Sequence, residues 1–178
     1  MSYPIAARDA LYTLFRAFLN HPEAKHEFSS EDLEPLRRRY PVYLEDRVPR
    51  YLKVLNWWKD QGKGGGIEDD LSLGEQLFNA GLFFDSHEYL EGVWRQTEGE
   101  DKTFLQGLIQ VAAAMHKLEL DPAAFEGALY LMDHGMKKIE ESPRFKDQTD
   151  YLAALVEIRN RIVAEQIDLS DLPELHFL

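Results

Sequence analysis

The chain has 178 residues, 44% of them apolar and 12% aromatic, and a chain of this size can bury about 70% of the surface that its unfolded form exposes. This composition excludes a globally disordered protein, and the length favours one domain or one domain with an extension. The 32 acidic and 20 basic residues give a net charge of −12, which disfavours nonspecific binding to nucleic acid or to anionic membrane surfaces.

The sequence contains no cysteine, which excludes disulfides, thiolate metal sites and cysteine catalysis, and which fits a reducing compartment. No apolar run reaches the length of a membrane span, and the first residues carry no basic-then-apolar secretory pattern. We therefore expect a cytoplasmic protein.

The N-terminal part, residues 1–61, is predicted to be a helical extension. Apolar residues at helical spacing behind an early proline predict a helix over residues 4–19. A serine followed by acidic residues can cap a short helix over residues 30–39, and an apolar stripe behind Pro49 predicts a further helix that ends near residue 61.

Residues 62–70 are predicted to be a linker. Four of the five residues 62–66 are glycines, and three acidic residues follow at positions 68–70. Neither the lysine and hydroxyl pair nor the preceding strand of a phosphate-binding loop accompanies these glycines. We expect the domain boundary here.

Residues 71–166 are predicted to form five helices with short connections, and residues 167–178 an irregular tail. Capping and turn residues place the helices at 72–80, 82–97, 102–118, 121–141 and 147–166. Ser72 and Glu75 form a capping box for the first of these helices, and Gly81 suits a left-handed cap after it. No segment alternates with a period of two, so the predicted fold class is all-α, an antiparallel helical bundle.

Two histidines and a glutamate are expected to point into this bundle. On a helical wheel His87 and Glu91 lie one turn apart at the apolar arc of their helix, whereas Glu88 projects about 100° away, nearer to solvent. His116 lies among the apolar residues of the next helix, and in an antiparallel hairpin it is displaced from His87 by only about 4.5 Å along the axis. Buried ionisable groups need a partner, and Arg159 in the last helix is a candidate for Glu91.

Two separated motifs resemble a known family. Residues 79–91 read Asn-Ala-Gly-Leu-Phe-Phe-Asp-Ser-His-Glu-Tyr-Leu-Glu, and residues 104–110 read Phe-Leu-Gln-Gly-Leu-Ile-Gln, followed by three alanines and His116. Over roughly residues 71–133 the chain is similar to the domain-of-unknown-function family 309, although Asp85-Ser86 stands where Glu-Ala is usual. The resemblance implies a small helical bundle, labelled a predicted metal-dependent hydrolase. Residues expected to support the site by polar contacts or packing are Asn79, Asp85, Trp94, Arg95, Gln106, Gln110 and Arg159.

Two functions are compatible with this pattern. In the first, His87, Glu91 and His116 bind a divalent metal, with zinc the best match, and Glu88 acts as the general base in a metal-dependent hydrolase, by analogy with the H-E-x-x-H helix. In the second, the polar core only fixes packing, and the protein is a noncatalytic helical module that binds another protein or a second copy. A single H-E-x-x-E is a weak signal, so both functions remain open. His134 is expected on the surface, opposite the apolar face of its helix.

Overall fold

The structure is a computed structural model that describes residues 4–20, 30–61, 65–145 and 149–176. The chain divides into two compact units, residues 1–63 and residues 64–178. The described residues form helices and contain no strand, so the predicted all-α class is confirmed. None of the described helices is both long enough and apolar enough to cross a bilayer.

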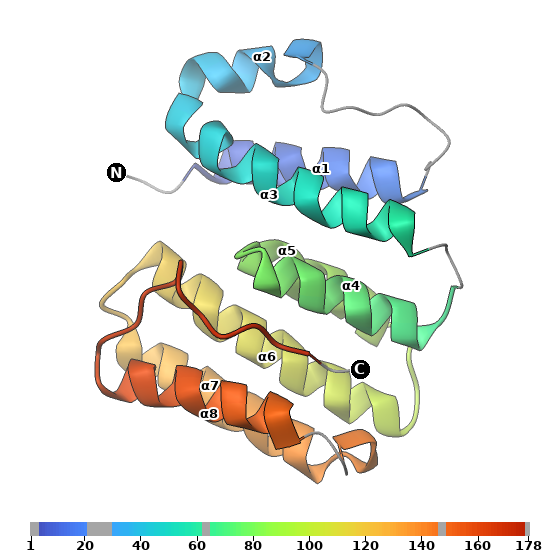
Figure 1. The fold of residues 1–178 in the computed structure, drawn as a ribbon, viewed down its shortest axis with the longest axis vertical. Coiled ribbons are helices and arrows are strands. Elements are labelled where there is room, and N and C mark those ends of the chain that lie inside the picture. Colours follow the sequence, from blue (N-terminus) through green and yellow to red (C-terminus); the bar gives the residue numbers. More distant parts are fainter. Residues whose placement is uncertain (1–3, 21–29, 62–64, 146–148, 177–178) are drawn as a thin grey trace. The chain divides into compact units, whose positions relative to one another are not determined.

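The first unit contains α1 (Ile5–Asn20), α2 (Ser30–Arg39) and α3 (Pro41–Asp60), all shown in Figure 1. The first two agree with the predicted helices to within one residue. The third begins at Pro41 and continues through Pro49, which the sequence analysis placed before its first turn. Its buried side chains, which include Leu44, Tyr51 and Val54, lie on both sides of Pro49. Burial of this continuous face therefore outweighs the proline penalty of about 3 kcal/mol.

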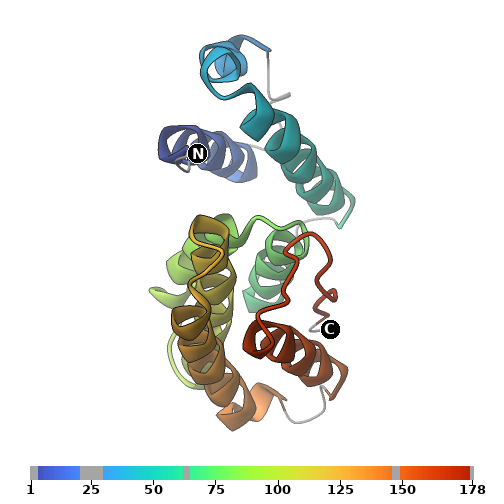
Figure 2. The same cartoon turned by 90° about the vertical axis from the view of Figure 1, so that its left-hand side faces the viewer.

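The second unit contains the five predicted α-helices and one short 3₁₀ helix, and each α-helix packs against the next one along the chain (Figures 1 and 2). Their bounds are α4 (Ile67–Asn79), α5 (Phe83–Trp94), α6 (Glu100–Leu120), α7 (Phe125–Glu141), η1 (Pro143–Phe145) and α8 (Thr149–Val163). One hydrophobic core runs through all five α-helices and includes Leu175 of the C-terminal segment.

Two of these helices begin four or five residues from the predicted start, and the other three begin within two residues of it. Helix α4 begins at Ile67 and not at Ser72, so the acidic residues 68–70 form its first turn, where carboxylates favour the positive end of the helix dipole. Helix α7 begins at Phe125 and not at Asp121, because the Asp121 carboxylate accepts a hydrogen bond from the Ala123 amide at 3.0 Å and holds a local turn. The left-handed conformation predicted for Gly81 is present, with φ = 69°.

Helices α6 and α7 cross with their backbones in direct contact. A Cβ atom added to Gly107 would lie 2.7 Å from the carbonyl oxygen of Gly135, and one added to Gly135 would lie 2.7 Å from the carbonyl oxygen of Gly107. Backbone atoms cannot rotate away as a side chain can, so only glycine fits at either position.

A tyrosine and a glutamate are buried in the core of the second unit. Tyr151 is 2% exposed and Glu75 is 8% exposed. Burial raises the pKa of Tyr151 well above its ordinary value, and the nearby charge of Glu75 raises it further. The phenol is therefore neutral in the folded protein at neutral pH.

We predict that Gly107→Ala destabilises the protein. Alanine gains up to about 1 kcal/mol in helix propensity, but a methyl group forced against a backbone carbonyl costs about 1–3 kcal/mol, so we expect a net loss of about 1–2 kcal/mol in urea unfolding. Gly127→Ala in α7 is the matched control, because its added Cβ would meet only the flexible end of the Lys117 side chain. Equal stability of the two variants would contradict the close crossing.

We also predict that Tyr151→Phe flattens the loss of stability at alkaline pH. The pKa of Tyr151 is higher in the folded than in the unfolded chain, so its contribution is complete below about pH 10 and is lost as the pH rises above that value, by at most about 1.4 kcal/mol per pH unit. Urea unfolding between pH 8 and 11 measures this slope. Tyr130→Phe, at a residue that is 62% exposed, should retain the native slope. The same slope in Tyr151→Phe and native protein would refute the assignment.

Candidate metal site on α5

Helix α5 brings together three side chains that can bind a metal. One ligand atom each from His87, Glu88 and Glu91 lies within 4.8 Å of the others. The side chains are 27%, 38% and 31% exposed, respectively, so all three lie at the border between core and solvent. In the parts of the chain that the structure describes, no other set of three or more histidine or acidic side chains is grouped in this way.

The rotation of α5 about its axis is set by its contacts with α4. The Ser86 hydroxyl donates a hydrogen bond to the Gly74 carbonyl oxygen at 2.8 Å, and Leu90 packs against the same glycine. The Tyr89 hydroxyl donates to an Asp70 carboxylate oxygen at 2.5 Å. Because Ser86 and Leu90 face α4, His87 lies about 100° further round the helix and cannot enter the core completely.

The Nδ1 atom of His87 is shielded from solvent and has no hydrogen-bond partner among the described residues. Oε1 of Glu88 lies 3.3 Å from it, but the two atoms do not have hydrogen-bonding geometry. A buried nitrogen without a partner costs about 1–3 kcal/mol, which a bound cation would recover. Oε1 of Glu91 accepts a hydrogen bond from Arg95 at 2.7 Å, and this bond fixes the orientation of the carboxylate.

His116 does not join this group. Its ring packs on Phe84 with the ring centroids 5.3 Å apart, and its Nδ1 lies 3.0 Å from Oε2 of Glu119, three residues further along α6. Phe84 precedes His87 by one turn on the same face of α5, so His116 lies on that side about one turn away from the cluster, and its Nδ1 faces Glu119 instead. The third side chain beside His87 and Glu91 is therefore Glu88, and not His116 as predicted. In the sequence, Glu119 three residues after His116 was the signal that His116 would pair within its own helix.

The predicted pairing of Arg159 with Glu91 is wrong. The Arg159 guanidinium donates a hydrogen bond to Oδ1 of Asp133 at 2.5 Å, and this contact raises the pKa of Arg159. Glu91 is paired instead with Arg95, the C-cap residue directly after α5. The reason is topological, because α8 packs on α7, whereas α5 packs between α4 and α6.

The glutamines of the second motif differ in environment. Gln110 accepts a hydrogen bond from the Lys138 ammonium group at 2.8 Å and so links α6 to α7, whereas Gln106 is exposed. His134 is exposed as predicted, and its Nδ1 lies 2.8 Å from the Tyr130 carbonyl oxygen.

The other motif residues precede or follow the cluster of His87, Glu88 and Glu91 in the chain. The Trp94 ring is covered by the Lys102 ammonium group at 4.7 Å, and Asp85 is buried, with 3% of its surface exposed. Asn79 binds the backbone of Leu175, near the C-terminus. This last contact was not predictable from the sequence, since a leucine in an irregular tail has no periodicity that marks it as buried.

The chain was compared with known proteins at the level of families, sequences and structures. The model of the family described as Domain of unknown function (DUF309) matches residues 71–124, which comprise most of α4, all of α5 and all of α6. Neither a curated protein nor a solved structure matches the chain. The match contains His87, Glu88 and Glu91, and it confirms the family resemblance of the two motifs. Residues 71–124 are therefore similar to the DUF309 family of domains of unknown function.

Proposed function

We propose that α5 binds a divalent transition metal through His87, Glu88 and Glu91, and that the protein is a metal-dependent hydrolase. The observation that carries this proposal is the cluster of three ligand atoms within 4.8 Å of one another. An imidazole nitrogen with carboxylate oxygens is a donor set that suits zinc. The buried Nδ1 of His87 supports the proposal, since a metal would give it the partner that it lacks among the described residues.

Three protein ligands leave coordination positions for water and substrate, as in catalytic zinc sites. Zinc bound there would supply a Lewis acid and an activated water at neutral pH. Glu88 then serves as a ligand, and Arg95 orients the Glu91 carboxylate through its hydrogen bond, as outer-shell residues do in metal enzymes. We retain the cytoplasm as the proposed location, because a chain without cysteine suits a reducing compartment.

We predict that His87→Ala abolishes stoichiometric zinc binding. Losing an outer-shell partner costs about 10–100-fold in metal affinity, so losing a direct ligand should cost more than about 100-fold. Isothermal titration of the untagged protein with zinc measures the affinity, and circular dichroism checks that the fold is kept. His134→Ala, which removes an exposed histidine from α7, should bind as the native chain does. If the native protein binds no zinc, the noncatalytic role of the cluster replaces this proposal.

We further predict that His116→Ala keeps the native zinc affinity. His116 is bound to Glu119 and lies outside the cluster, so its loss should lower thermal stability without affecting the metal. The same titration, with a thermal melt beside it, separates the two effects. A loss of affinity as large as that of His87→Ala would instead favour the ligand set of His87, Glu91 and His116.

A further inference from the structure

The C-terminal segment is bound to the second unit as an extended peptide. After α8 the described residues 164–176 contain no helix, and they run back along the bundle to reach α4 (Figures 1 and 2). Most of residues 164–171 are exposed, whereas Leu175 is only 2% exposed. Ile167, Leu169 and Leu172 are half-buried against the core, so the segment packs along its length, and Leu175 is its most buried residue.

Asn79 recognises the backbone of this segment at one residue. Its Nδ2 atom donates to the carbonyl oxygen of Leu175 at 2.8 Å, and the Leu175 amide donates to its Oδ1 atom at 2.9 Å. These two bonds satisfy the one donor and the one acceptor that an extended residue presents, as a neighbouring β-strand would. Such a contact binds an extended chain of any sequence.

The side chain of Leu175 supplies the specificity. It is 2% exposed and lines a small apolar cavity together with Gly74, Phe78, Leu90 and Leu108 of α4, α5 and α6. A Cβ on Gly74 would clash with Leu90, so the absence of a side chain at this position lets Leu90 pack closely on α4 beside the cavity. Burial of a leucine side chain contributes about 1.5–3 kcal/mol, which makes Leu175 the anchor of the segment.

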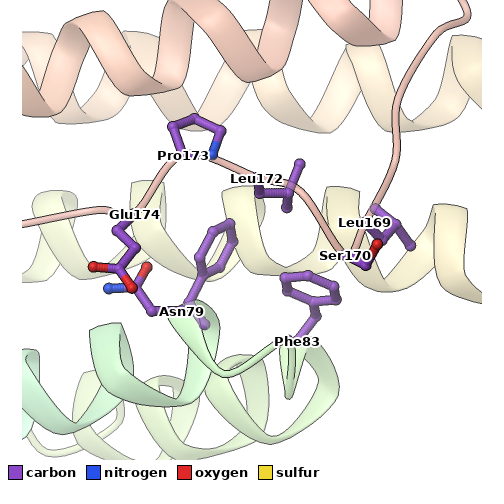
Figure 3. A pocket seen from close by; sticks show the side chains of 9 residues that line it. Asn79, Phe83, Leu169, Ser170, Leu172, Pro173 and Glu174 are labelled. Atoms are coloured by element: carbon purple, nitrogen blue, oxygen red, sulfur yellow. The ribbon is translucent and has the colours of Figure 1, made fainter.

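Beside the anchor the fit is incomplete. A cavity of about 50 Å³ separates Asn79 and Phe83 of the helices from Leu172 and Pro173 of the segment (Figure 3). Pro173 stiffens the segment in an extended form, which lowers the entropy that binding costs. At the next position after the anchor, Nδ1 of His176 lies 3.8 Å from Oε1 of the buried Glu75, a carboxylate that favours a basic or histidine side chain there.

We propose that α4, α5 and α6 form a peptide-binding groove for an extended segment of the type Leu-Pro-x-Leu-His, and that residues 172–176 of the chain are its resident ligand. The occupant in trans is a peptide of the same chemistry, with leucine at the anchor. This proposal does not depend on a metal at α5. Because the resident segment is tethered, it competes at an effective concentration of about 1 mM, so an external peptide binds well only when the tether is displaced.

The test uses a peptide of residues 167–176, capped at both ends and labelled with a fluorophore, and the full-length chain carrying Leu175→Asp. The substitution releases the resident segment from the groove, since burial of a carboxylate among apolar side chains is unfavourable. Fluorescence anisotropy should show at least tenfold tighter binding to Leu175→Asp than to the native chain. Equal affinities, or no binding to Leu175→Asp up to about 1 mM peptide, would overturn the proposal.

Matched controls identify the contacts. Val163→Asp adds the same charge at a residue of α8 that is 54% exposed, and it should bind the peptide no better than the native chain does. Adding Asn79→Ala to Leu175→Asp should weaken binding at least tenfold, and a peptide with aspartate in place of Leu175 should not bind. If circular dichroism shows that Leu175→Asp is unfolded, Leu175→Ala replaces it under the same criterion.

Discussion

The close contact between α4 and α5 at Gly74 is the constraint that positions the candidate metal site, and it lies next to Leu175. On one side it fixes Ser86 and Leu90 against α4, which leaves His87 at the border of the core. On the other side Gly74 lines the small cavity beside Leu175. A larger residue at this position would press on Leu90 and turn α5, so the candidate metal site and the groove would be altered together.

The helical architecture was predictable because local sequence patterns determine it. Apolar spacing and prolines located the eight α-helices of the described residues, and the absence of a period of two excluded strands from the prediction. The errors arose where a local rule met a competing interaction. Helix α3 continues through Pro49 because its apolar face is buried on both sides of the proline. The acidic residues 68–70 lie in the first turn of α4, where the helix dipole stabilises carboxylates. The side chain of Asp121 stabilises a turn before α7.

The candidate site was only partly predictable for a related reason. Placing His87 and Glu91 on one face requires only the period of a helix, and the structure keeps them together with Glu88. Placing His116 required the direction in which a side chain of a second helix turns, and its acidic neighbour on α6 decides that direction. The contact of Asn79 with Leu175 joins residues 96 positions apart, and no local pattern in the sequence encodes it.

Tyr151 and Leu175 line the same small cavity, and this gives the protein an intrinsic optical reporter. While Leu175 is bound to the bundle, the Tyr151 side chain is buried and hydroxide cannot reach its phenol. Leu175 is one wall of this cavity, so release of the stretch after α8 would open it at a lower cost than unfolding of the bundle. After a rapid jump to alkaline pH, the rate at which Tyr151 forms tyrosinate, measured by absorbance, would therefore report how often the C-terminal segment dissociates from the bundle.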